Sequence, residues 1–447
     1  MLKLLKLFSS VIATLFLTAT AISAGETNPD LVSTHGLFIL NTLLFLIGGF
    51  LVMWMAAGFA MLEAGLVRSK NVTTQLTKNV ALFSIAAIAY YLIGFNLMYP
   101  GDLKDGSWWF AGYLGPIFSI VSLEPVEPDV SQIVNIGYAS VGSDFFFQLM
   151  FCATTASIVS GTIAERMKLW PFLVFTIFLT ALIYPIEASW KWGGGWLENI
   201  GFSDFAGSTI VHAAGASAAL AGAMVLGPRI GKYKKDGSVI PMPGSNMPLA
   251  TLGTFILWLG WFGFNGGSQL ALGTINDATD VSRIFTNTNT AAAGGALAAL
   301  ILTQLMYKKI DLTMVLNGAL AGLVSITAEP LVPSIGTATL IGAAGGVIVV
   351  ISVPLFDKLK IDDVVGAISV HGVAGIWGTL AVALSKGGII DQIIGIVSIC
   401  TFVFVLSLLI WYLMDALVGI RVSEEDELNG LDTSELGMDA YPEFSKN

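Results

Sequence analysis

Two histidines at matched positions are the residues of this sequence best suited to chemistry. His212 lies in DFAGSTIVHAAG and His371 in DVVGAISVHGVAG, and both segments follow the pattern Asp-x-x-Gly-x-x-x-Val-His. The whole chain has only three histidines. Imidazole accepts and passes protons near neutral pH, so two imidazoles brought together predict a proton-handling site. A lone histidine would more simply be a core residue bonded to a carbonyl or hydroxyl group.

The residues around each histidine predict how it is positioned. Asp204 and Asp363 each precede their histidine by eight residues and are expected to cap the free N–H groups of a helix start. Nearby glycines would let the two helices pack closely. No metal site is expected, because a pair of histidines lacks the three or four protein ligands that zinc takes. No cofactor is predicted.

Composition predicts the elements that carry these residues. The chain is 55% hydrophobic and only 12% charged, about half the charge of an average soluble protein. Eleven apolar runs are long enough to span a bilayer. They lie near residues 38–64, 79–99, 144–164, 169–187, 207–227, 248–267, 290–307, 313–330, 336–356, 364–384 and 391–418. We therefore expect an all-α polytopic membrane protein.

The two histidine segments begin the fifth and tenth of these runs. An odd offset makes the two helices run in opposite directions, which is the sequence signature of an inverted repeat. The expected architecture is an inverted 5+5 repeat followed by an eleventh helix, with the site near the membrane midplane. The two imidazoles would then meet at the pseudo-twofold axis.

The ends of the chain and its basic residues predict topology. Residues 1–24 are interpreted as a cleavable signal peptide, 25–420 as the membrane domain and 421–447 as an acidic cytoplasmic tail. Most of the 21 lysines and arginines, including Arg68, Lys70 and Lys78, fall in alternate connections. The positive-inside rule then predicts an N-terminus outside and a cytoplasmic C-terminus. No basic patch suggests nucleic acid as a partner.

Several further motifs, in one order along the chain, resemble the Amt/MEP/Rh family of ammonium transporters. They are GFAMLEAGLVRSKN at 58–71, FFFQLMFCATTASIVSGTIAERMK at 145–168, WFGFNGGS at 261–268 and GIRVSEEDELNGLDTSELGMDAY at 419–441, together with the two histidine segments. The resemblance covers nearly the whole chain after the signal, and its Trp and Ser positions favour the Amt branch.

The resemblance implies a role for each matching position. It implies an outer recruitment site for ammonium, a gate of stacked phenyl rings and a pore lined by twin histidines, with two flanking residues as support. The corresponding residues are Trp192, Phe147, Ser268 and Asp204 for recruitment; Phe151 and Phe264 for the gate; His212 and His371 for the pore; and Gln148 and Asn265 as support. One departure is Glu63, which stands where many members have an aromatic residue and has no assigned role.

The resemblance also implies a homotrimer in the plasma (inner) membrane, with a PII-type protein as a regulator of the tail. The expected activity is capture of ammonium, loss of its proton and passage of ammonia. Holding a cation on aromatic faces and excluding ions from an apolar pore are consistent with this.

Three other functions stay open at the sequence level. They are a passive ammonia gas channel, an ammonium sensor that signals to a separate cytoplasmic partner, and a channel for another small neutral solute such as urea or carbon dioxide. An enzyme is not expected, because the membrane segments contain no nucleophile–base set.

Overall fold

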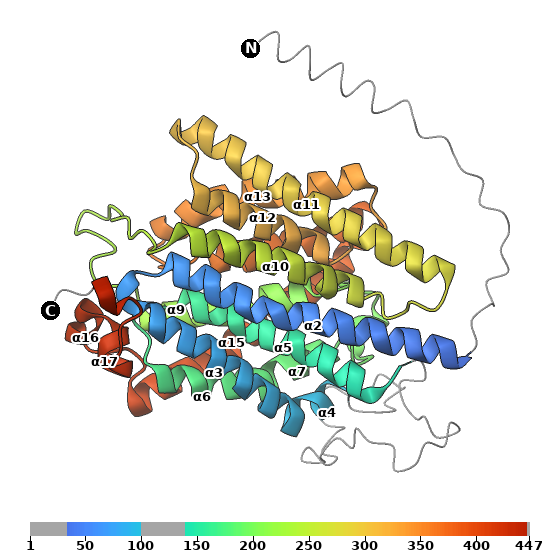
Figure 1. Cartoon of the computed structure of the whole chain (residues 1–447), viewed down its shortest axis with the longest axis horizontal. Coiled ribbons are helices and arrows are strands. Elements are labelled where there is room, and N and C mark those ends of the chain that lie inside the picture. The colour runs from blue at the N-terminus through green and yellow to red at the C-terminus, as the bar shows by residue number, and fades with distance from the viewer. Residues whose placement is uncertain (1–33, 100–138, 445–447) are drawn as a thin grey trace, which may run out of the picture.

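The computed structural model describes residues 34–99 and 139–444, and within these ranges the fold is all-helical. Beyond the helices there are only two isolated β-bridges in the described residues. Most of the long helices run roughly along one axis of the molecule (Figure 1). The expected signal peptide lies outside the described residues.

The long elements follow the chain in the order that the apolar runs predict. They are α2 (Thr34–Leu66), α3 (Val72–Ala89) with η2 (Tyr90–Gly94) and α4 (Phe95–Met98), α5 (Val141–Thr162), α6 (Leu169–Phe178) with η4 (Leu179–Ile183) and α7 (Tyr184–Ser189), η5 (Ser208–Ala213) with α9 (Ala214–Leu226), α10 (Met247–Gly267), α11 (Ile275–Tyr307), α12 (Leu312–Thr327), α13 (Ile335–Lys358), η6 (Ile368–Val373) with α14 (Ala374–Ala381) and η7 (Val382–Leu384), and α15 (Ile389–Val418). Short elements are η1 (Ser69–Asn71), α8 (Trp196–Asn199), α16 (Glu424–Asn429), α17 (Leu431–Leu436) and η8 (Pro442–Phe444).

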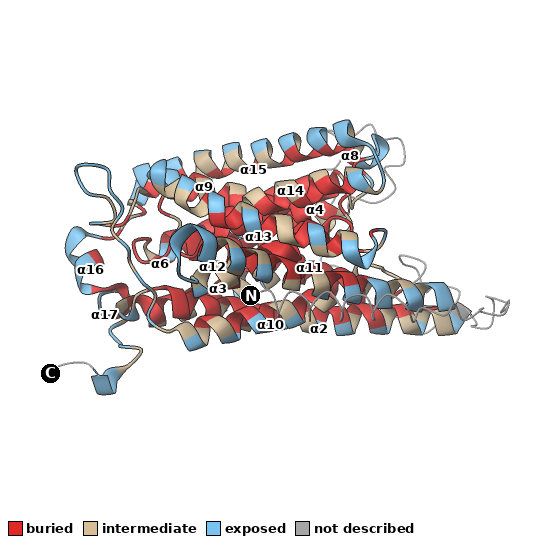
Figure 2. Cartoon of the chain, turned by 90° about the horizontal axis from the view of Figure 1, so that it is seen from above, coloured by how far each residue is buried: buried red, intermediate tan, exposed pale blue. Residues whose placement is uncertain are grey.

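The described residues contain 9 helices that are long and apolar enough to cross a membrane. Two shorter apolar helices, Leu312–Thr327 and Ile368–Leu384, fall where the sequence predicts the eighth and tenth spans. Buried residues line the inward faces of the bundle, and exposed ones follow the outer side of α15 (Figure 2). Large apolar side chains such as Leu417 on α15 and Leu340 on α13 are exposed, which suits contact with lipid.

Two segments differ from the sequence-based prediction. The seventh run was expected to begin at 290, but α11 begins at Ile275 because Thr274 and Asp277 form a capping box at its start. Lys78, assigned above to a connection between spans, is fully buried within α3. Its position therefore contributes nothing to a basic membrane surface.

Small residues let α11, α12 and α13 approach each other closely. A Cβ on Gly342 or Gly346 would collide with the backbone oxygen of Ala291 or Gly295, and a Cβ on Gly322 would meet Ala291 as well. Backbone contact of this kind is typical of helix pairs in membranes, where small residues replace the hydrophobic effect as the basis of association.

Four connections at one end of the bundle are tied by buried ion pairs. Glu165 accepts from Arg68 Nε at 2.6 Å and from Arg229 Nη1 at 3.2 Å, and Arg229 Nε donates to Asp362 at 2.8 Å. Burial alone would raise the pKa of Asp362, but the guanidinium groups of Arg166 and Arg229 outweigh it and lower that pKa below its usual value. The charged form of Asp362 therefore belongs to the native state.

The acidic tail is folded against this end of the bundle. Val422 N donates to Arg166 O at 3.1 Å, and Arg421 Nη2 binds Glu427 at 2.8 Å. Asp432, which is buried, accepts the N–H groups of Thr73 and Thr74 at the start of α3 at 2.9 and 2.7 Å. The tail is therefore structured up to residue 444 (Figure 1).

Candidate functional site

The two histidines meet in the interior of the bundle. His371 Nδ1 and His212 Nδ1 are 3.2 Å apart, within hydrogen-bond reach, and the ring centroids are 5.1 Å apart at 22°. The exposed fraction is 0% for His212 and 4% for His371. The side-by-side placement predicted from the repeated motif is therefore found. One imidazole must donate and the other accept in this bond, so their tautomers are complementary.

Both histidines lie in short π-helical turns, η5 and η6, at the start of their helices. Each turn follows a glycine in the left-handed region, Gly207 with φ 105° and Gly366 with φ 83°. This is the conformation that favours glycine, and it recurs at the same motif position in both halves. π-Turns inside helices are frequent at functional sites, because the extra residue redirects nearby side chains.

The two aspartates of the motif hold these turns, as their spacing predicts. Asp204 accepts four backbone N–H bonds at 2.8–3.1 Å, from Gly207, Ser208, Thr209 and Ile210. Burial raises the pKa of Asp204, while the four N–H donors act in the opposite direction.

Asp363 caps η6 in the same way but binds fewer backbone N–H groups. It accepts from Ala367 N at 3.1 Å and Ile368 N at 2.7 Å, and from the Thr162 hydroxyl at 2.9 Å. Both capping sites thus use the aspartate of the motif, but Asp204 accepts four backbone N–H groups and Asp363 accepts two.

Aromatic rings continue outward from the histidines as a stacked column. His212 stacks on Phe264 with centroids 5.3 Å apart, and Phe264 stacks on Phe151 at 4.1 Å and 28°. Phe151 and Phe264 are buried. Trp261 packs on the His212 ring at 4.9 Å. Between Phe151 and the imidazoles the column consists of phenyl rings, which offer no hydrogen-bond acceptor to a bare ion.

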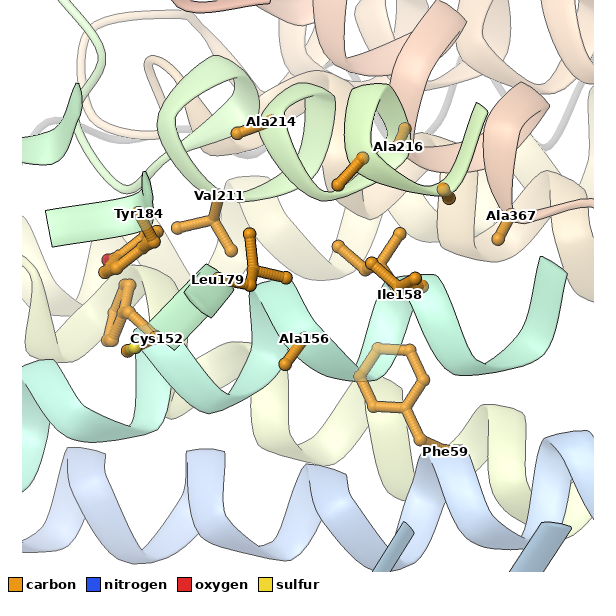
Figure 3. Close-up of a cluster of buried hydrophobic side chains, with 14 of the residues drawn as sticks. Phe59, Cys152, Ala156, Ile158, Leu179, Tyr184, Val211, Ala214, Ala216 and Ala367 are labelled. Atoms are coloured by element: carbon orange, nitrogen blue, oxygen red, sulfur yellow. The ribbon is translucent and has the colours of Figure 1, made fainter. Parts of the chain in front are cut away.

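Figure 3 shows further buried apolar side chains in this interior, from α2, α5 and the η5–α9 helix, among them Phe59, Ile158 and Val211. Phe59 also faces the His371 ring, with centroids 6.1 Å apart. The walls around the imidazoles are therefore largely apolar.

A cavity of about 160 Å³ lies at the outer end of the column. Its lining includes Trp192, Phe147, Ser268 and Gln148, together with Phe151, which the sequence predicts to be a gate residue. Trp192 meets Phe151 edge to face at 5.9 Å. Ser268 Oγ donates to its own helix at Phe264 O, so its lone pairs remain available to accept.

Two predicted site residues lie behind this cavity rather than on its wall. Asp204 is used as a cap, and its carbonyl oxygen accepts from Trp192 Nε1 at 3.1 Å. It therefore positions the tryptophan through the backbone. Asn265 is buried and donates to the Thr288 hydroxyl at 3.0 Å.

One carboxylate in the outer cavity was not predicted from the sequence. Asp144, in the first turn of α5, lines it and hydrogen-bonds with Gln148. Residues three and four positions apart share a helix face, so the spacing of Asp144 from Phe147 and Gln148 could have revealed it.

Two spaces follow on the opposite side of the histidines. A narrow one is lined by His371, Phe59 and Glu63, and a wider one of about 320 Å³ is lined by charged residues such as Arg229 and Asp363. Asn317 and Val365 line both. Among the residues that the structure describes, no group of three or more His, Cys, Asp and Glu could hold a metal ion.

Known proteins resemble this chain over most of its length. The profile of the Ammonium Transporter Family matches residues 43–441. Ammonium transporter Amt2 of Archaeoglobus fulgidus is 39% identical over 97% of this chain and 95% of its own length. Ammonium transporter Amt1 of Haloferax mediterranei is 36% identical over 90% of this chain and 80% of its own length.

Solved structures give the same result. One described as a sensor Amt protein superposes with a TM-score of 0.82 at 34% identity, covering 90% of this chain and 100% of that chain. Candida albicans Mep2 superposes with a TM-score of 0.78 at 26% identity, covering 92% of this chain and 93% of that chain. The chain therefore belongs to the ammonium transporter family.

Proposed function

We propose that this protein is an ammonium transporter that captures ammonium outside, removes its proton and conducts ammonia inward past the twin histidines. The proposed architecture is eleven spans, an inverted 5+5 repeat plus an eleventh helix, after a cleavable signal peptide. The proposed setting is a homotrimer in the plasma (inner) membrane, with the N-terminus outside and the tail in the cytoplasm. The relatives named above are ammonium transporters by name, not enzymes.

The outer cavity supplies the chemistry that a small cation needs. The faces of Trp192 and Phe147 attract a cation, by about 0.5–2 kcal/mol depending on how far it is desolvated. Ser268 Oγ offers an acceptor for one N–H bond, and Asp144 offers negative charge. Ammonium is small enough to use all of these groups together.

The observation that carries the proposal is the stacked column from Phe151 through Phe264 to the hydrogen-bonded histidines. An ion that enters an apolar passage loses its hydration at a cost of several kcal/mol, whereas neutral ammonia loses much less. His212 and His371 are the groups along this passage that can hold and transfer a proton, since their Nδ1 atoms are 3.2 Å apart. Proton and ammonia would therefore separate at the rings and move on independently.

The test uses His212→Ala and His371→Ala in proteoliposomes. Ammonium-evoked current on a solid-supported membrane reports charge movement, and a pH-sensitive dye inside the vesicles reports ammonia flux. Each variant should lose the current. His35→Ala is the matched control, because His35 is the remaining histidine and is exposed at the start of α2. Selective, ammonium-evoked current of wild-type size in both pore variants would refute the relay.

A sensor role is the second candidate, and the likeness to the sensor Amt structure favours it. The docked tail, which contacts the start of α3 through Asp432, is the surface through which a PII-type partner would act. Vesicles without any partner separate the two functions, because a transporter moves ammonium there and a pure receptor does not.

A further inference from the structure

A buried carboxylate lies beside the histidines on the side away from the aromatic gate. Glu63, near the end of α2, is 1% exposed and lines the same narrow space as His371. The space open to the centre of a water molecule is about 10 Å³ there, which is enough for roughly one water. Carboxylates are costly inside membrane segments and are generally retained there for a function.

Three hydrogen bonds hold the carboxylate of Glu63 in place. Oε2 accepts from the side-chain amides of Gln75 and Asn79, both at 2.6 Å, and Oε1 accepts from the Ser160 hydroxyl at 2.7 Å. All three donors are neutral, so they stabilise the carboxylate without neutralising it. The donors come from two other helices, α3 and α5.

Two titratable groups face this carboxylate among the described residues. Lys78, from α3, is fully buried and attracts Glu63 electrostatically, yet its Nζ has no hydrogen-bond partner in the described part of the chain. Nζ lies 5.3 Å from the centre of the Phe172 ring. His371 faces Glu63 from η6 across the narrow space. The remaining polar groups around it are the amides and hydroxyls named above, together with Ser157 and Asn317.

We propose that Glu63 is the proton acceptor that takes the proton from His371 and releases it toward the cytoplasm. The inference rests on the proposed transport function. With its Nδ1 engaged by His212, His371 has Nε2 left to donate. A proton from His212 Nδ1 forms an N–H bond on His371 Nδ1 as the Nε2–H bond of His371 breaks, so the ring ends neutral. A water in the narrow space accepts the released proton and gives up one of its own, which forms an O–H bond on Glu63. Ammonia, already neutral, is not needed for this step.

The exit from Glu63 is short. Leu66, three residues further along α2, lines the wider cavity of about 320 Å³ that opens beyond. Three residues of helix rise by about 4.5 Å, so one turn separates the carboxylate from that cavity. Asp363 and Asp357 on its wall are the next carboxylates available to a departing proton.

The test compares Glu63→Gln with wild type in the two vesicle assays above. The variant should lose ammonium-evoked current by roughly 10²-fold, the usual contribution of one acid–base group, and keep dye-reported ammonia flux. Glu329→Gln is the matched control, since Glu329 is also a buried glutamate but pairs with Lys386 away from both inner cavities. It should keep its current.

The outcomes separate the two proposals. If wild type carries no ammonium-evoked current, the relay as a whole is overturned, and Glu63 with it. If wild type carries current and Glu63→Gln carries as much with an unchanged pH profile, only the role of Glu63 is overturned.

A measurement on wild type tests the proposal even if Glu63→Gln does not fold. Infrared difference spectra recorded on ammonium addition should show a protonated carboxyl band. Ser160→Ala should shift that band, because its hydroxyl donates to Glu63. A merely structural carboxylate would give no such band at any pH at which current flows, and that result would overturn the proposal.

Discussion

The cap at Asp204 allows a quantitative prediction for Asp204→Asn. The carboxylate accepts Gly207 N and Ser208 N on one oxygen, and Thr209 N and Ile210 N on the other. An asparagine amide keeps one oxygen and turns an NH₂ group toward the other pair. Two buried N–H groups therefore lose their acceptor, at about 1–3 kcal/mol each, or about 2–6 kcal/mol in total. That is a large part of a typical unfolding free energy.

Asp363→Asn is the matched comparison within the same repeat. Its carboxylate serves only two backbone N–H groups, one on each oxygen, and the Thr162 hydroxyl can rotate to accept from an amide instead. Only one N–H is orphaned in either orientation of the amide. The expected loss is about 1–3 kcal/mol, roughly half that of Asp204→Asn.

The assay is unfolding in mild detergent titrated with a denaturing one, followed by tryptophan fluorescence and circular dichroism. The free energy of unfolding of both variants is compared with that of wild type under identical conditions. A loss of less than about 1 kcal/mol in the unfolding free energy of Asp204→Asn, or equal losses in the two variants, would refute this role of the carboxylates.

Three further predictions concern other carboxylates. Asp144→Asn should raise the KM for ammonium about fivefold with kcat retained, since Asp144 is buried in the cavity wall and one hydrogen bond to the cation contributes about 1 kcal/mol. An unchanged KM in transport assays would contradict this role. In Asp432→Ala, a protease should cleave the tail about tenfold faster than in wild type, because two N–H groups of α3 lose their acceptor. Equal cleavage rates would argue against docking of the tail through Asp432. The pKa of Asp362 is lowered, so its stabilising effect relative to Asp362→Asn should be complete above about pH 4 and shrink as pH falls further. Unfolding titrations of wild type and Asp362→Asn at several pH values measure this effect. A stability difference that does not change with pH would contradict the prediction.

The parts of the site that the sequence predicts are those marked by a local or repeated pattern. The order and approximate position of the spans follow from apolar run length, and the meeting of His212 with His371 follows from a motif that occurs twice. The start of α11 was missed because residues 275–289 are polar and no apolar run marks them. There the helix depends on its capping box and on contacts such as those of Asn287 with the carbonyl oxygens of Pro330 and Pro333, rather than on hydrophobic periodicity.

The surroundings of Glu63 could not be predicted for a different reason. Its hydrogen-bond partners Gln75, Asn79 and Ser160 lie on two other helices, and no spacing in the chain links them to it. Lys78 was misassigned because a charge beside an apolar run was taken as a loop residue. Only the packing of α3 against α5 and α6 makes it an interior group.

The inequality between the two halves of the repeat has a consequence for the resting state of the histidine pair. Two imidazoles in identical surroundings would share one proton with two arrangements of equal energy. Here His371 has a carboxylate across a water-sized space, whereas His212 Nε2 has no partner among the described residues. The arrangement with hydrogen on Nε2 of His371 is therefore lower in energy. In this arrangement His212 carries its hydrogen on Nδ1, and its Nε2 is unprotonated and able to accept a proton. A duplicated element has in this way acquired a polarity that duplication alone would not give it.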